Sequence, residues 1–353
     1  MRFVHIENLR SGEQLARPIF APDGRILLNS GVQMETTYIE RLRGLGIPGV
    51  YVIDEDRPGV EVPETISQRT RTEATANIKA VFDSVRVGKT FRLDEVGQSV
   101  KAIIDEIVQN PNVLASLSDV RSYDGYTFSH SVNVCVISVM LGVKKGYNEK
   151  QLYELGLGAI LHDIGKTQVP EDILTKPGRL TDEEMAIMQQ HTTFGWQILR
   201  QNPDVPLSSA HVAYQHHERP QGLGYPRGLT SDRILPYAKI VSVADAYDAM
   251  TSERAYQRGM LPHEALRIIH RLKGVQFEPD IVDLLDLCVA QYPVGCMVRL
   301  NSREIGIVVD INQQERARPI IRVLYDRWGK RLQQFWELDL AKTRHLSIVE
   351  VVE

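Results

Sequence analysis

The sequence has few cysteines, little excess charge and no strongly basic character. Its three cysteines, Cys135, Cys288 and Cys296, form no CxxC pair, which argues against a disulfide framework and a cysteine-rich zinc site. The formal net charge is −4, whereas proteins that hold nucleic-acid backbone are usually basic, so a nucleic-acid binder is disfavoured. What remains is an ordinary globular composition, with 43% hydrophobic and 24% charged residues.

Signals for membrane insertion or export are also missing. The first residues, MRFVHIENLRSGEQ, contain no apolar core of a signal peptide. The longest apolar stretch, Val132–Val143, is about 12 residues long, whereas a membrane-spanning helix needs about 20. We therefore expect a cytoplasmic protein without a membrane span.

The length of 353 residues predicts several domains, and the residue patterns differ along the chain. Residues 1–56 combine strand-like segments with one helical segment and predict a small α+β module. Residues 57–119 predict a linker with leading helices, and residues 120–292 predict a helical domain. Strand-like segments over residues 293–353 predict a small β domain. The predicted fold class is therefore mainly α, with a central helical bundle between two small modules.

The helical prediction rests on apolar residues that recur with the period of a helix. The segment VGQSVKAIIDEIVQN places five apolar side chains on one face: Val96, Val100, Ile103, Ile104 and Ile107. Further periods of this kind cover residues 130–142, 150–163, 181–200, 234–251, 262–272 and 279–291. Near the carboxyl end, MVRLNS, EIGIVVDI and PIIRVLYD are typical of strands.

Metal-ligand side chains are concentrated in the helical region. Seven residues form the candidate set: His130, His162, Asp163, His191, His216, His217 and Asp245. Imidazole and carboxylate groups bind divalent iron, manganese, zinc or nickel, and a helical bundle can direct them inward from several helices. An aspartate such as Asp163 has two oxygens, which can bridge two cations about 3.5–4 Å apart.

Taken singly, each of these residues also has an ordinary structural explanation. A lone histidine such as His130 or His191 can be a hydrogen-bonded core residue, and the pair His216-His217 can lie in an exposed loop. Asp245 is harder to explain, because it stands in the apolar run IVSVADAYDAM. Burying its carboxylate without a cation or strong donors would cost several kcal/mol.

The motifs around these residues resemble the HD-GYP family, a branch of the HD phosphohydrolase superfamily. The resemblance is carried by AILHDIGKTQVPEDIL and HHERPQGLGYP, in this order, and by TFSHSVNV, KPGRLTDEEMAIMQQH and KIVSVADAYDAMTSERAY. It covers residues 120–292, and more weakly the flanking modules. It implies an HD-type helical bundle that hydrolyses the bacterial second messenger cyclic di-GMP to pGpG, with GMP as a further product left open.

The resemblance further implies two divalent metal ions per chain, with iron or manganese expected first and zinc or nickel also compatible. One ion would be held by His130, His162, Asp163 and Asp245. The other would be held by Asp163, His191, His216 and His217, so that Asp163 bridges the pair. Tyr126 stands where members with three metals carry a glutamate, which is why we expect two ions.

The same resemblance implies contacts with the substrate. Lys166 and Arg254 are expected to contact its phosphate oxygens and to complete the catalytic group with Asp163. Gly222 and Tyr225 belong to the loop that names the family and are expected to lie near the substrate. GGDEF-domain proteins are candidate partners for this loop, and a homodimer is compatible with the sequence.

The loop departs from the family pattern at one position. Gln221 replaces the aspartate of HHExxDGxGYP, which puts turnover or partner contacts in question rather than the metal ligands. Two alternatives therefore stay open. One is a weakly active or inactive member that senses a cyclic dinucleotide or docks a GGDEF partner; the other is a phosphohydrolase for another nucleotide.

Two further interpretations concern supporting residues. Glu218 follows His217 without the second histidine of an HExxH zinc motif, so we expect it to support a ligand. The carboxyl-terminal segment is rich in basic residues, for which a solvated basic face is the expected explanation. These residues are Arg316, Arg318, Arg322, Arg327, Lys330 and Arg331.

Overall fold

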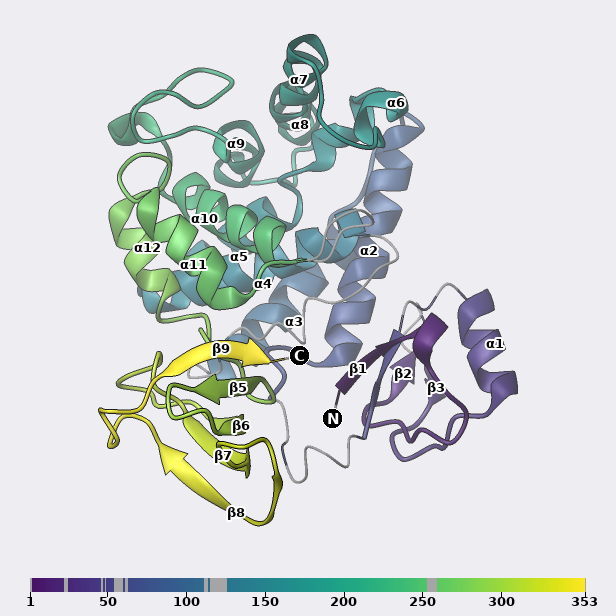
Figure 1. Ribbon diagram of the computed structural model, residues 1–353. Coiled ribbons are helices and arrows are strands. Elements are labelled where there is room, and N and C mark those ends of the chain that lie inside the picture. Colours follow the sequence, from purple (N-terminus) through teal and green to yellow (C-terminus); the bar gives the residue numbers. More distant parts are fainter. Residues whose placement is uncertain are drawn as a thin grey trace.

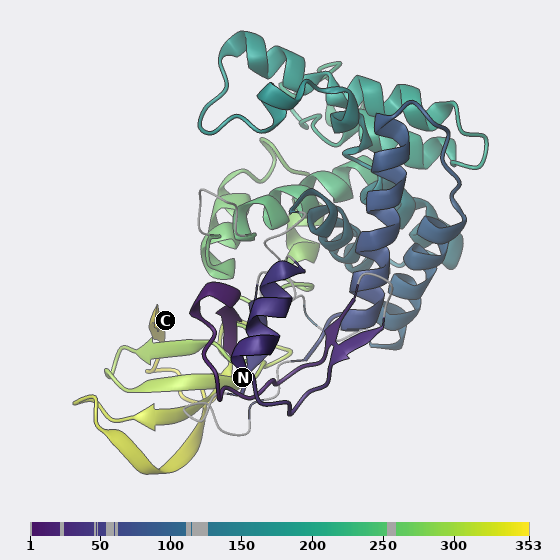
Figure 2. The same cartoon turned by 90° about the vertical axis from the view of Figure 1, so that its right-hand side faces the viewer.

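The computed structural model describes residues 2–21, 25–45, 47, 49–53, 60, 63–110, 114, 126–252 and 259–352. A helical domain forms the bulk of the molecule, and two smaller modules lie below it (Figures 1 and 2). The predicted mainly α fold class, with an α+β module at one end and a β domain at the other, is confirmed.

The amino-terminal module has its own apolar core. Strand β1 (Arg2–His5) pairs antiparallel with β4 (Gly49–Val52), and β2 (Ile19–Phe20) pairs with β3 (Ile26–Leu28). Short helix η1 (Ile6–Asn8) and helix α1 (Thr36–Gly44) complete the module. Its core is made by apolar side chains that include Leu15, Met34, Leu42 and Val52.

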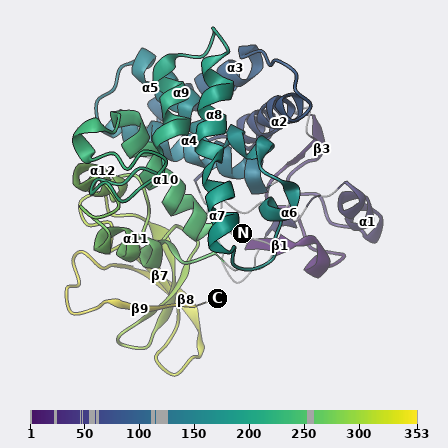
Figure 3. The same ribbon diagram turned by 90° about the horizontal axis from the view of Figure 1, so that it is seen from above.

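The helical domain is built around α4 (Tyr126–Lys144), which the other helices surround (Figure 3). Every residue from 131 to 142 is buried, because α4 is apolar on nearly all sides and contacts neighbours around its circumference. Its neighbours are α2 (Gln68–Arg86), α3 (Asp94–Gln109), α5 (Glu149–Ile160), α10 (Pro236–Thr251) and α12 (Pro279–Leu285).

The remaining helices cover the ends of this bundle. They are η3 (Ile164–Gln168), α6 (Glu171–Leu174), α7 (Asp182–Gln189), α8 (His191–Arg200), α9 (Leu207–Gln215), η4 (Ser231–Arg233) and α11 (Pro262–Arg271). Among them, α8 packs against both η3 and α9, and α9 also packs against α5.

The leading helices share the core of the helical domain. All five apolar residues of the predicted α3 stripe are buried, from Val96 to Ile107. Ser67 caps the start of α2: its side chain accepts a hydrogen bond from the Thr70 amide, and Glu106 of α3 accepts one from the Ser67 hydroxyl. The boundaries at residues 57, 120 and 293 stay predictions.

Some helices are shorter than the apolar periods predict. The segment 181–200 is divided at Gln190 into α7 and α8, and the segment 279–291 is helical only to Leu285. In the segment 150–163 the α-helix ends at Ile160, because the amide of His162 donates to the carbonyl of Ala159, three residues back. This tighter turn carries His162 and Asp163 out of the helix.

The carboxyl-terminal domain is a five-stranded antiparallel sheet with the order β8-β7-β6-β5-β9. Its strands are β5 (Met297–Leu300), β6 (Ile305–Asp310), β7 (Ile320–Tyr325), β8 (Arg331–Asp339) and β9 (Ile348–Val352). Val60, from the predicted linker, is buried against Ile307 and Leu324 of this sheet. Among the helices that the structure describes, none is long and apolar enough to cross a bilayer.

Candidate metal centre

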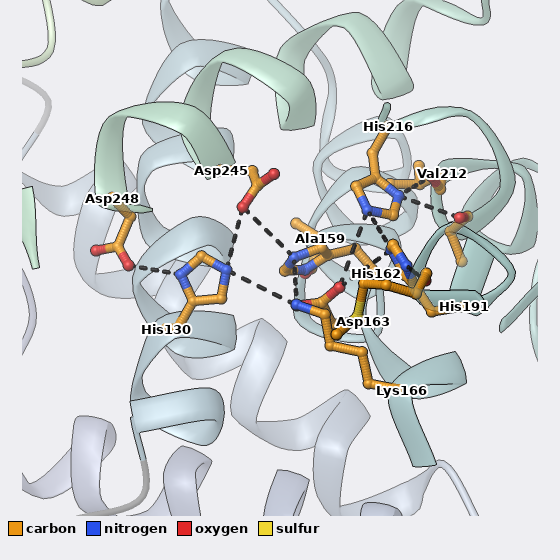
Figure 4. Close-up of polar contacts among 12 residues, drawn as sticks. His130, Ala159, His162, Asp163, Lys166, His191, Val212, His216, Asp245 and Asp248 are labelled. Atoms are coloured by element: carbon orange, nitrogen blue, oxygen red, sulfur yellow. Dashed lines mark hydrogen bonds and ion pairs between the residues drawn. The ribbon is translucent and has the colours of Figure 1, made fainter. Parts of the chain in front are cut away.

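The structure brings all seven predicted metal-ligand residues together in the helical domain. Figure 4 labels six of them, all except His217. His130 comes from α4, Asp245 from α10 and His191 from the first position of α8. The two sequence pairs follow directly after helices: His162-Asp163 after α5 and His216-His217 after α9.

Three sets of three residues bring their ligand atoms within 4.8 Å of one another; one of them, His162, Asp163 and His216, joins the other two, which share no residue. The first of these two, called the His130 group below, consists of His130, His162 and Asp245. The second, called the His191 group, consists of His191, His216 and His217. These groups coincide with the two ligand sets that the sequence predicts, apart from the shared Asp163.

Asp163 lies between the two groups and turns one oxygen toward each. Its Oδ2 atom is 3.4 Å from Nε2 of His162 and 3.9 Å from Nε2 of His130. Its Oδ1 atom is 3.6 Å from Nε2 of His191 and 3.9 Å from Nε2 of His216. A carboxylate placed in this way is suited to bridge two cations.

Backbone carbonyls set the orientation of three imidazoles. Nδ1 of His162 lies 2.7 Å from the Ala159 carbonyl oxygen, and Nδ1 of His191 lies 2.7 Å from that of Met188. Nδ1 of His216 lies 3.1 Å from the carbonyl oxygens of Val212 and Ala213. Because a carbonyl only accepts, each Nδ1 carries the proton, and each Nε2 directs a lone pair into the centre.

His130 is held by a side chain instead of a carbonyl. Its Nδ1 is 2.6 Å from Oδ2 of Asp248, and its Nε2 is 3.1 Å from Oδ1 of Asp245. Asp248 is fully buried. Asp248 is not among the predicted site residues. Its position three residues after Asp245 in an apolar run was a usable signal, because residues three apart share a helix face.

Two buried ligand atoms have no hydrogen-bond partner in the described part of the chain: Nε2 of His162 and Oδ1 of Asp163. An unsatisfied buried polar atom costs about 1–3 kcal/mol, and most such atoms in proteins are paired. Two cations would satisfy them, one beside Nε2 of His162 and the other beside Oδ1 of Asp163. The mixed imidazole and carboxylate donors therefore fit divalent transition metals.

The protonation of the histidines suits metal binding in the His191 group. Burial lowers the pKa of His191 to about 4 and that of His217 to about 3, so both rings are neutral near pH 7. Burial also lowers the pKa of His130, but the hydrogen bonds and charges of Asp245 and Asp248 outweigh it and raise the pKa to about 10. The two carboxylates thus favour positive charge beside His130.

Gly165 allows the backbone approach that places Asp163 beside His191. A Cβ atom at Gly165 would lie 1.9 Å from the carbonyl oxygen of His191 and 2.4 Å from the amide nitrogen of Gly195. Only glycine permits η3 to lie this close to the first turns of α8. The glycine of the HDIGK segment is therefore part of how the site is assembled.

The Lys166 side chain contacts Asp163, three residues earlier in the sequence. In a 3-10 helix, side chains three residues apart eclipse each other, and Nζ of Lys166 is 2.5 Å from Oδ2 of Asp163. Burial would raise the pKa of Asp163, but the charges of Lys166 and His162 hold it well below its usual value. Arg254 and the side chain of Tyr126 lie outside the described residues.

The loop after His217 folds back onto the centre. The amide of Tyr225 donates to the carbonyl of His217 at 3.2 Å, and the two rings lie 4.7 Å apart. Gly224 is required here, because a Cβ atom would lie 2.4 Å from the amide nitrogen of Arg219. Gly222 has a φ of +76°, which glycine adopts without strain. Tyr225 therefore borders the His191 group.

Glu218 supports this loop and not an imidazole, which corrects the expectation from its neighbour His217. Its carboxylate is only 2% exposed and accepts hydrogen bonds from the amides of Arg227 and Leu229, both at 2.8 Å. Gln221 is exposed, and its side-chain nitrogen lies 3.4 Å from the carbonyl oxygen of Gly274. Residue 221 also pairs with Thr230, so the substitution at this position affects the base of the loop.

Comparison with known proteins agrees with this geometry. A protein-family model described as an HD domain matches residues 104–281, and one described as a KOW domain associated with the HD domain matches residues 297–353. A cyclic di-GMP phosphodiesterase of Pseudomonas aeruginosa is 34% identical over 259 residues, which cover 73% of this chain and 62% of the relative. One of Thermotoga maritima is 42% identical over 172 residues, covering 48% and 46%.

The chain thus spans less than two thirds of the length of either relative. Among solved structures, an HD-GYP protein from Bdellovibrio bacteriovorus superposes with a TM-score of 0.53 at 18% identity, covering 81% of this chain and 98% of that one. This likeness supports the fold. The matched family model spans the helices that supply the clustered histidines and aspartates, and the chain belongs to the HD domain family, in its HD-GYP branch.

Proposed function

We propose that the protein is a metal-dependent phosphodiesterase that hydrolyses cyclic di-GMP to pGpG. The observation that supports this most is the position of Asp163, with one oxygen toward each group of ligand atoms. Two divalent ions held there would activate a water molecule for in-line attack on phosphorus and neutralise charge on the phosphoryl oxygens. The relatives named cyclic di-GMP phosphodiesterases support the choice of substrate.

In this proposal each group holds one ion. The His130 group and Oδ2 of Asp163 hold the first, and the His191 group and Oδ1 of Asp163 hold the second. Iron or manganese is the first choice, and zinc or nickel also suits imidazole and carboxylate donors. The three carbonyl-bound imidazoles keep their Nε2 lone pairs directed at the ions.

Lys166 and Tyr225 are the described residues proposed to meet the substrate. The Lys166 side chain is 28% exposed. Its ammonium group can therefore contact a phosphate oxygen of the substrate while it stays beside Asp163. Burial and the charge of Asp163 raise the pKa of Tyr225, so its phenol stays protonated and can donate a hydrogen bond. Gly222 gives the loop the turn that brings Tyr225 there, and Arg254 is proposed as the second phosphate contact.

A binding role without turnover is the second candidate, because Gln221 alters the base of the loop. Leu223, near the tip of the loop, is 72% exposed and is suited to contact a protein partner such as a GGDEF domain. Under this alternative the protein senses a cyclic dinucleotide. Cytoplasmic location and a homodimer remain predictions.

A single-turnover assay with metal analysis separates these functions. Protein purified without oxygen and loaded with Mn²⁺ or Fe²⁺ is mixed in excess with cyclic di-GMP, and the products are separated by chromatography. We expect pGpG and about two ions per chain. Binding of cyclic di-GMP without cleavage, with both ions present, would favour the sensor, and faster cleavage of another cyclic dinucleotide or of a nucleotide monoester would reassign the substrate.

A further inference from the structure

The imidazoles of the centre differ in what holds their outer nitrogen. His162, His191 and His216 donate from Nδ1 to neutral backbone carbonyls. His130 alone among the described histidines of the centre donates to a carboxylate, that of the buried Asp248. A carboxylate partner makes a ligand imidazole a stronger donor and fixes its orientation.

The two groups also differ in negative charge. The His130 group contains Asp245, rests on Asp248 and faces Oδ2 of Asp163. Around the His191 group, the only carboxylate within 4.0 Å of a ring nitrogen in the described part of the chain is the shared Asp163. A divalent cation is therefore attracted more strongly to the His130 group.

The ligand atoms differ in type as well. The His130 group offers two nitrogens and a carboxylate oxygen besides Asp163, whereas the His191 group offers three nitrogens. Oxygen donors suit Mn²⁺, and imidazole nitrogens suit later metals such as Zn²⁺ and Ni²⁺. Charge and donor type therefore both favour Mn²⁺ at the His130 group.

We infer that Asp248 is a positioning residue that makes the two ion positions unequal, so that Mn²⁺ binds first and more tightly at the His130 group. This inference rests on the proposed dinuclear centre. It assigns a role to a residue outside the predicted ligand set, and it implies that the His191 group decides which later metal completes the pair.

Titration of metal-free full-length protein with Mn²⁺, followed by electron paramagnetic resonance of the free ion, tests the inference. Wild type should bind two ions in two steps of different affinity. Asp248→Asn keeps the size of the side chain but removes its charge, and should weaken the tighter step by about 10–100-fold while leaving the other unchanged. His191→Ala should remove the weaker step. Asp204→Asn, the same change at an exposed position, is the matched control.

The outcomes distinguish the inference from the proposed function. Two equal Mn²⁺ affinities in wild type would overturn the inference without any variant, and so would an Asp248→Asn protein that weakens both steps equally or neither. Absence of Mn²⁺, Fe²⁺ and Zn²⁺ binding to wild type would instead overturn the proposed function. With Zn²⁺ the affinities of the two binding steps should differ less than with Mn²⁺, because Zn²⁺ favours the nitrogens of the His191 group.

Discussion

Arg318 of the carboxyl-terminal β domain and the pair His162-Asp163 of the helical domain differ in how their hydrogen bonds are satisfied. In the β domain, the guanidinium group of Arg318 donates to four backbone carbonyls, those of Leu340, Thr343, Arg344 and Leu346. In the helical domain, His162 and Asp163 each keep a buried polar atom without a partner among the described residues.

This difference separates structural polar residues from functional ones. A group whose hydrogen bonds are made within the protein stabilises one fold, whereas unsatisfied atoms that lie together among converging imidazoles and carboxylates indicate a ligand. Isolated unsatisfied atoms, such as Oγ of Ser302 in the β domain, carry no such indication. The expected solvated basic face holds for Arg327, Lys330 and Arg331, which are exposed. It is wrong for Arg318, which donates to carbonyls of the segment that follows β8.

The largest expected effect comes from substituting Asp163, which keeps a buried oxygen without a partner among the described residues. Asp163→Asn leaves a single ligand oxygen in place of two, so it should remove the bridge and reduce cyclic di-GMP turnover by more than about 100-fold, beyond the loss typical of supporting residues. Turnover and elemental analysis on the same samples test this. Unchanged metal content and turnover, relative to Asp204→Asn, would remove Asp163 from the centre.

Removing the Arg318 side chain should lower stability and leave cyclic di-GMP turnover unchanged. Arg318→Ala leaves several carbonyls of the β domain without their donor, so we expect the free energy of unfolding of that domain to fall by about 2–3 kcal/mol. Urea unfolding followed by tryptophan fluorescence, in a Trp196→Phe background that leaves only Trp328 and Trp336, measures it. Arg327→Ala, at an exposed position stacked on Trp328, is the control and should change the value by less than about 1 kcal/mol.

Glu218 tests the same difference within the helical domain. Its carboxylate accepts two hydrogen bonds from the loop, although it directly follows the ligand residue His217. In Glu218→Gln the amide nitrogen cannot accept, so one of the two hydrogen bonds to the loop is lost. We expect the KM for cyclic di-GMP to rise about tenfold, the equivalent of one charge-assisted hydrogen bond, while metal content is retained. Steady-state kinetics with metal analysis test this. Loss of metal would show that Glu218 acts on His217.

The smallest expected effect, on stability, comes from an exposed ion pair. Lys145 and Asp280 lie 2.7 Å apart at the surface between α4 and α12. Partial burial opposes the shift, but the hydrogen bond and charge of Lys145 lower the pKa of Asp280 below its usual 3.8. The pair therefore stabilises the protein at neutral pH and loses this effect as the pH falls through the lowered pKa.

Asp280→Asn should accordingly lower stability at pH 7 by less than about 1 kcal/mol. Thermal unfolding of wild type and variant between pH 7 and pH 3 measures the difference, which should shrink toward low pH and at high salt. A difference that grows as the pH falls would contradict the assignment of the pair.

Local periodicity predicted the elements whose side chains alternate or repeat cleanly. The apolar stripe of α3 and the strands β5, β6 and β7 belong to this class. Strand β8 was missed, because its partly buried residues Leu332, Phe335 and Leu338 recur every three positions where its pairing with β7 shifts register. A period of three is typical of neither a strand nor an amphipathic helix.

The amino-acid sequence by itself determined which ligand types are present and in what order, because imidazole and carboxylate chemistry belongs to the side chains. The resemblance to the HD-GYP family already implied two groups bridged by Asp163. Only the tertiary structure decided which Asp163 oxygen faces each group and that Asp248 holds His130. The last contact joins residues 118 positions apart. Such a contact depends on how α4 and α10 pack, and no local pattern along the chain encodes that.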